Sequence, residues 1–198
     1  MPAMRLVGLV AALTSVVACG APFWNSPPPK PWTPPPLSDL PAGSLDASER
    51  GVQQWVLNYR RGKSRVLLVQ DSTLEFAYQR FRDSVWRDDS SLVASLRTRN
   101  SSRVALVAES LSVTVPVILV SDSVVRSRDW RALYRRHRGA SSILAVSRVG
   151  FNADTTRALV DLQTLCSPDL CGGIQRILLA RAPGRAWTLW RADWIVNY

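Results

Sequence analysis

The carboxyl-terminal stretch 143–196 constrains the fold most, because it reads as four short strands separated by turn signals. Each strand-forming run ends in a cluster of Asn, Asp, Pro or Gly residues, a pattern typical of an antiparallel meander. In the second run, Ala158, Val160 and Leu162 share one face and alternate with Asp161 and Gln163. This period of two predicts one buried and one solvated face.

The last run of the meander repeats that alternation with larger side chains. Trp190, Trp194 and Val196 alternate with Arg191 and Asp193. Because tryptophan contributes more apolar area than any other residue, we expect both tryptophans to lie in the core. An exposed aromatic binding strip is the alternative, since aromatic residues also dominate interfaces.

The upstream elements predict helices and strands in turn. Apolar residues at helical spacing follow the cap-like residues that begin at Ser44, and Gly62 ends that helix. The other elements expected are strands 65–70 and 117–121 and helices 91–99 and 128–138. This order predicts an α+β fold, with a mainly antiparallel sheet ending in a four-strand meander and helices packed on one face.

The amino terminus predicts export. Residues 1–18 carry one arginine and an apolar run too short to span a bilayer, which indicates a signal peptide. The sequence Val16-Val17-Ala18-Cys19 resembles the bacterial lipobox. The resemblance implies a bacterial lipoprotein in which Cys19 is the lipidated, palmitate-bearing residue and the first residue after cleavage. An ordinary signal peptide with an incidental cysteine is the alternative.

A lipidated Cys19 makes the expected location the cell envelope. Residues 19–43 form a Pro-rich spacer that favours polyproline II, and residues 44–198 form a single α+β domain. Two or more acyl chains anchor a protein stably to a membrane. In lipoprotein sorting, the absence of aspartate after the cysteine favours the outer membrane if the cell has two membranes, and Gly20 occupies that position.

The domain ending resembles a group of uncharacterised extracytoplasmic bacterial proteins. Their shared pattern is SRVGFN-x-D-x-T-x-ALV, a cysteine-containing hairpin and a final tryptophan strand. The matching residues are Ser147 to Asn152, Asp154, Thr156, Ala158 to Val160, Cys166, Cys171, Gly172, Leu179, Arg181, Gly184, Arg185, Trp187 and Trp194. The resemblance implies architecture and an extracytoplasmic location, and it implies no activity or site residues.

Cys166 and Cys171 flank a four-residue turn between two predicted strands. Across a hairpin their Cα atoms fall within reach of a disulfide, and an exported protein meets oxidising conditions. We therefore predict a structural disulfide. A redox pair or half of a metal site is the alternative, but the helix start and the additional ligands that those sites need are missing from the sequence.

No catalytic, metal or cofactor motif stands out. His137 is the only histidine, and it continues the apolar stripe of the 128–138 helix, which argues against a Ser-His-Asp site. Asp71, Asp88, Asp89 and Asp169 lie at predicted turns or caps, where aspartate is expected for backbone reasons. We therefore expect no catalytic residue, no metal and no cofactor.

The formal net charge of +10 predicts an anionic partner without specifying it. Arg128, Arg131, Arg135 and Arg138 recur at helical spacing and predict a basic binding face. A merely solvated helix face is the alternative. The lipobox argues against nucleic acid and favours anionic lipid, an acidic envelope polymer or a protein partner.

Three functional hypotheses follow. The leading one is a membrane-anchored, non-enzymatic binding module of the cell envelope. The second is an envelope hydrolase that uses carboxylates not identified from the sequence. The third is a structural component of the envelope.

Overall fold

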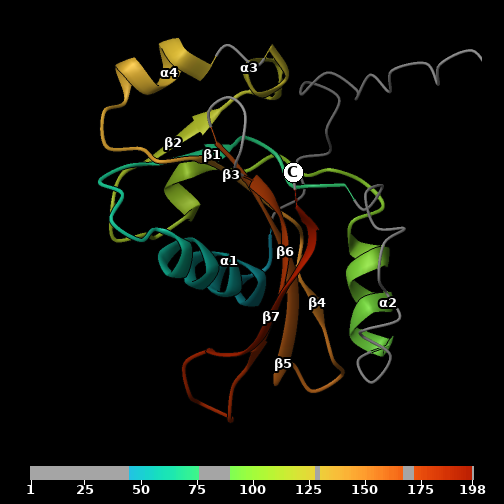
Figure 1. Cartoon of the computed structure of the whole chain (residues 1–198). Helices are drawn as coiled ribbons and strands as arrows, with labels where there is room; N and C mark the ends of the chain where they lie inside the picture. Colours follow the sequence, from blue (N-terminus) through green and yellow to red (C-terminus); the bar gives the residue numbers. More distant parts are fainter. Residues whose placement is uncertain (1–44, 76–89, 128–129, 167–171, 198) are drawn as a thin grey trace, which may run out of the picture. The chain divides into compact units, whose positions relative to one another are not determined.

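Helices and strands alternate along the first part of the domain, and antiparallel strands form its carboxyl-terminal part (Figure 1). The computed structural model describes residues 45–75, 90–127, 130–166 and 172–197, all within the compact unit Pro35–Tyr198. The helical elements are α1 (Ala47–Arg60), α2 (Ser90–Arg99), the 3-10 turn η4 (Ala108–Ser110), α3 (Asp122–Ser127) and α4 (Trp130–Arg136). The strands are β1 (Leu67–Gln70), β2 (Val117–Val120), β3 (Ile143–Val146), β4 (Gly150–Phe151), β5 (Arg157–Leu165), β6 (Gly172–Ala180) and β7 (Thr188–Asn197).

Helix α1 begins after an aspartate cap, which is one of the predicted cap-like residues that begin at Ser44. The Asp46 carboxylate accepts a hydrogen bond from the Glu49 backbone N–H at 2.7 Å, which satisfies one of the free donors of the first turn. Val52, Val56 and Leu57 are fully buried and hold the helix against the sheet. The predicted first helix is therefore confirmed.

The sheet is mixed. Among the described residues it has seven strands, in the order β2-β1-β3-β5-β6-β7, with β4 also pairing with β5. Strand β1 pairs in parallel with β2 and β3, whereas the later pairs are antiparallel. The predicted meander is confirmed, but its first strand is divided into β3 and β4. The parallel pairs arise because each helix-containing connection returns the chain to the end of the sheet at which the preceding strand began.

The expectation that helices cover one face is not confirmed. In β5, Ala158 and Val160 point toward α1, whereas the intervening Leu159 packs against α2. In β1, Leu68 faces α3 and α4, opposite to its neighbours in the core beneath α1. Helix α1 therefore covers one face, and α2, α3 and α4 cover the other (Figure 1).

The prediction that both tryptophans of the last strand lie in the core is wrong. Trp190 is 70% exposed and Trp194 is 37% exposed, whereas Trp187 is buried. The pairing of β6 with β7 shifts register twice, between Ile174 and Gln175 and between Leu178 and Leu179. Each shift inserts an extra residue into β7, so simple alternation does not predict which side chains point inward.

The predicted helix 128–138 is also corrected. Its described part is the short helix α4, which ends at Arg136, and a separate helix α3 precedes it over residues for which the sequence predicted no element. Arg128 lies outside the described residues.

Candidate functional site

Helix α4 presents arginines to solvent because its apolar side is fixed to the sheet. Trp130, Leu133 and Tyr134 pack beside Leu68 and Ile143. The Trp130 indole N–H donates to the Val125 carbonyl at 3.1 Å, and the Tyr134 hydroxyl donates to the Leu165 carbonyl at 3.4 Å. Burial raises the pKa of Tyr134. These contacts determine which side of α4 faces outward.

The outward side of α4 and Arg138, two residues beyond its end, are strongly basic. Arg131 and Arg135 are exposed, as the predicted basic face required, and Arg136 is exposed beside them. Arg138 is also exposed but lies beyond the helix, in an isolated bridge to Ala140. The described part of the predicted basic face is therefore Arg131, Arg135 and Arg138.

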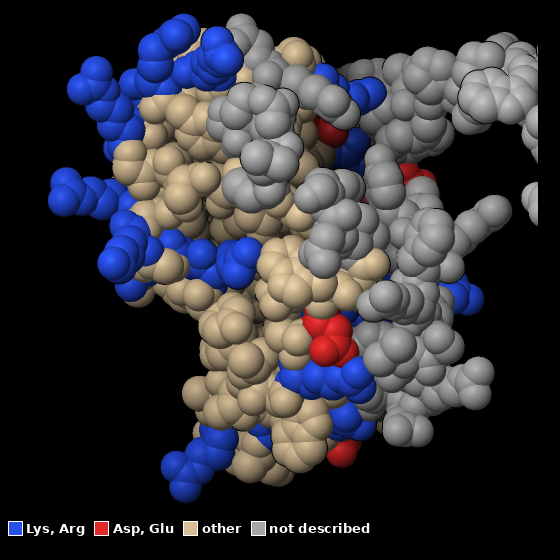
Figure 2. Space-filling model, in the orientation of Figure 1, with Lys and Arg blue, Asp and Glu red and all other residues tan. Residues whose placement is uncertain are grey.

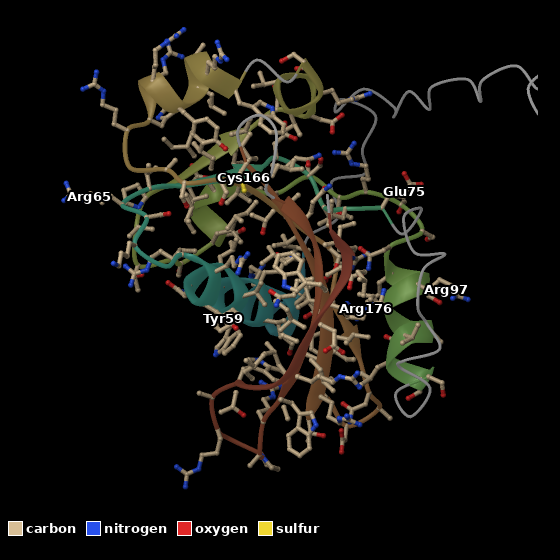
Figure 3. All side chains as sticks on the ribbon, in the orientation of Figure 1. Tyr59, Arg65, Glu75, Arg97, Cys166 and Arg176 are labelled. Atoms are coloured by element: carbon tan, nitrogen blue, oxygen red, sulfur yellow. The ribbon has the colours of Figure 1, made fainter. Side chains whose placement is uncertain are left out.

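A second basic segment, missed from the sequence, lies against the end of α4. The α1–β1 loop contains Arg61, Lys63 and Arg65. The Arg65 N–H donates to the Gly139 carbonyl at 3.0 Å, and Gly139 has a φ of +106°, which favours glycine. Figure 3 labels Arg65 at this edge of the molecule. A nearby serine pair adds a 2.8 Å hydrogen bond between the Ser64 and Ser141 hydroxyls.

The two segments together form one surface, which we call the basic surface. Its members are Arg61, Lys63, Arg65, Arg131, Arg135, Arg136 and Arg138. Neither 60–66 nor 130–142 contains an Asp or Glu. In Figure 2 a group of basic side chains stands out over α4 and the α1–β1 loop, with others elsewhere in the view, and the visible acidic side chains lie away from these two segments. The short polar sequence RRGKSR was the signal for the second segment, since it concentrates charge without periodicity.

Several arginines elsewhere in the described chain are paired with carboxylates. Arg99 and Arg148 flank the buried Glu49, each with a nitrogen 3.2 Å from Glu49 Oε2. Arg176 pairs with Asp161. No ion pair joins a member of the basic surface to any carboxylate that the structure describes. Cations collected without counter-charges raise the local positive potential, and an anionic partner relieves their mutual repulsion.

A separate polar cluster lies where β1 and β2 end. Asp122 accepts hydrogen bonds from Gln70 Nε2 at 2.8 Å and from Arg103 Nη2 at 3.1 Å. The buried Arg103 side chain also donates to the Ser72 hydroxyl. The carboxyl ends of parallel strands are the usual position of ligand sites in open α/β sheets.

Asp71 belongs to the same cluster. Burial raises the pKa of Asp71 and the Asp122 carboxylate adds to the rise, whereas the Arg103 guanidinium opposes it. Asp71 Oδ1 is buried, and no described residue donates a hydrogen bond to it. Within the described ranges, no group of three or more His, Cys, Asp or Glu side chains is placed to hold a metal ion.

Several predicted residues fall outside the described part of the chain. These are Cys19, Asp88, Asp89, Arg128, Cys171 and Asp169. Cys166 follows the last residue of β5, and Leu165 pairs with Gly172 across the hairpin. His137 is half-buried just after α4, and its backbone N–H donates to the Leu133 carbonyl at 2.9 Å.

No family model, curated protein or solved structure matches the chain. Among the described helices, none is long and apolar enough to cross a membrane. The lipobox and the resemblance to an extracytoplasmic family therefore stay predictions.

Proposed function

We propose that this protein is a lipid-anchored, non-enzymatic binding module of the cell envelope, and that its domain binds an anionic surface or polymer through the basic surface. The observation that carries the proposal is the gathering of exposed arginines from α4 and the α1–β1 loop without a described carboxylate partner. Such a surface suits repeated anionic groups, because its cations are spread over two segments.

The anionic groups of a bilayer and of an acidic envelope polymer share the chemistry that this surface would recognise. A basic residue near an anionic membrane contributes about 1 kcal/mol to binding. Neutralising two residues should therefore weaken vesicle binding roughly 30-fold. The attraction should decrease with salt, because exposed charges are screened beyond about 8 Å at physiological ionic strength.

The test compares two variants with the same change in net charge. Arg131→Gln with Arg135→Gln removes two members of the basic surface, and Arg97→Gln with Arg185→Gln removes two exposed arginines elsewhere. Non-lipidated protein is co-sedimented with vesicles of anionic or zwitterionic lipid, and its affinity for a soluble acidic polysaccharide is measured in parallel. The first variant should lose binding and the second should keep it. Equal losses of binding in the two variants would show that net charge alone determines binding, which would contradict a specific role for the basic surface.

The predicted anchor supports an envelope location and is tested separately. Cys19→Ser should release the protein from membranes, since the acyl chains attach to that thiol. Cell fractionation of wild type and variant measures the distribution. Retention of the unacylated variant on membranes to the wild-type level would contradict the anchor.

The second candidate function is an envelope hydrolase, and one observation favours it. Asp71 has a raised pKa beside Asp122 at the carboxyl ends of two parallel strands, and a carboxyl group of that kind suits a general acid. Incubation with envelope glycans and phosphodiester polymers, followed by product analysis, tests it. Product formation that Asp71→Asn abolishes would favour the hydrolase over the binding module.

A further inference from the structure

Strand β7 is an exposed sheet edge with an apolar character. It is ten residues long, and within the described chain it pairs with β6 alone. It presents Leu189, Trp190 and Trp194, which are 41%, 70% and 37% exposed. An edge strand with free backbone groups and exposed aromatic residues is a template for pairing with another strand.

The centre of β7 is regular. Between the two register shifts, Arg191 to Trp194 pair without interruption with Gln175 to Leu178. The Arg191 and Asp193 side chains share one face of the sheet, with Arg191 Nη2 2.6 Å from Asp193 Oδ2. Their side chains are 39% and 36% exposed.

The charges on this face alternate across the sheet toward the edge. Asp161, Arg176 and Asp193 lie opposite one another on β5, β6 and β7. Arg176 Nε is 2.8 Å from Asp161 Oδ1, and the row ends at the acidic Asp193. A strand added beside β7 would continue the alternation if it placed a cation opposite Asp193.

We propose that β7 pairs antiparallel with β7 of a second copy of this chain, about a two-fold axis at Ala192. This register places Arg191 opposite the partner's Asp193, and Asp193 opposite the partner's Arg191. It also brings Trp190, which the register shift between Leu178 and Leu179 inserts into β7, beside the partner's Trp194 on each side of the axis. The sequence Trp190-Arg-Ala-Asp-Trp194 is therefore self-complementary in charge and in side-chain type.

Alternative registers lack this complementarity. A slip of two residues in either direction places Arg191 opposite the partner's Arg191, or Asp193 opposite the partner's Asp193. A parallel in-register pair does both. Like charges directly opposite each other destabilise a strand pair, so the charges select the register centred on Ala192. The two-fold arrangement is isologous and closes at the dimer.

Charge reversal tests the pairing. Arg191→Asp makes the centre of the strand acidic and Asp193→Arg makes it basic. Two copies of the same variant therefore repel each other, whereas one copy of each variant restores opposite charges across the pair. Full-length chains carrying two different tags are co-expressed, extracted in mild detergent and captured by one tag. Wild type should co-purify with wild type. Two differently tagged copies of the same variant should co-purify about tenfold less than wild type does. The two different variants should co-purify with each other to near the wild-type level.

A second measurement does not depend on the reversed charges. Ala192→Cys places one thiol on each side of the two-fold axis, and mild oxidation of full-length protein should give a disulfide-linked dimer. Thr188→Cys, on the same strand but away from the axis, is the matched control and should crosslink much less. Circular dichroism confirms that each variant folds.

Two results would overturn the proposal. One is a wild-type chain that fails to recover its differently tagged copy, and the other is equal crosslinking at positions 188 and 192. Either result would leave the basic surface unaffected, because none of its members lies on β7.

Discussion

Removal of the buried Arg176 should destabilise the domain severely. Arg176 and Asp161 are 1% and 2% exposed, and the guanidinium meets both carboxylate oxygens, at 2.8 Å and 3.1 Å. Arg176→Met leaves Asp161 as a buried charge without its main counter-ion, and Asp193 lies opposite on the other side. Breaking a buried pair by removing one partner costs about 3–5 kcal/mol.

That loss should lower Tm by roughly 10 °C, given about 2–4 °C per kcal/mol for a domain of this size. Urea unfolding followed by tryptophan fluorescence gives the free energy of unfolding for wild type and variant. The control is the double variant Asp161→Leu with Arg176→Met, which replaces both charges by apolar side chains. It should recover most of the loss, because no charge stays buried at this position. A single-variant loss below about 1 kcal/mol, or a double variant no more stable than the single one, would refute the reasoning.

Three further predictions test separate parts of the structure. Gly150→Ala should lower the free energy of unfolding, measured in urea, by several kcal/mol, because a Cβ there would lie 2.5 Å from a backbone nitrogen of α2. Unchanged stability would contradict this close packing of α2 on Gly150. Asp71→Asn should raise Tm at pH 7, and the gain should disappear as pH falls toward the ordinary aspartate pKa of 3.8 and the wild-type carboxyl is protonated in both states. A gain that persists at low pH would exclude charge burial as its cause. Cys166 and Cys171 should be oxidised to each other, so mass spectrometry with and without reductant should differ by about two protons in one peptide; two free thiols in non-reduced protein would contradict the disulfide.

The sign of the Asp71 effect follows from linkage. Its folded pKa is raised, so the folded state binds protons more tightly than the unfolded state. The stability of the wild type therefore decreases as pH rises from 3.8 through the folded pKa, and stays lower above it. Asparagine carries no charge at any of these pH values, so the variant lacks this decrease.

Local patterns predicted much of the fold. The cap-like residues that begin at Ser44 and the helical spacing of Val52 and Val56 predicted α1, and the turn clusters predicted the meander. Both signals act over a few residues, so a single sequence contains them. The parallel pairing of β1 with β2 and β3 could not be predicted, because it depends on strand order rather than on local pattern.

The candidate site was predicted in part for the same reason. Arg131 and Arg135 recur at helical spacing, whereas Arg65 joins them through a backbone hydrogen bond to Gly139 that only the folded chain forms. The two bulges in β7 likewise have no signal in the sequence, and they leave Trp190 exposed where alternation places it inside.

The most direct test of the central claim is the salt dependence of binding by non-lipidated wild-type protein. Its partitioning is measured on vesicles of anionic lipid and of zwitterionic lipid, at several salt concentrations. The basic surface predicts binding to the anionic vesicles that weakens steadily as salt rises, and negligible binding to the zwitterionic ones. Equal binding to both kinds of vesicle, or binding that salt does not change, would contradict an electrostatic role for these arginines.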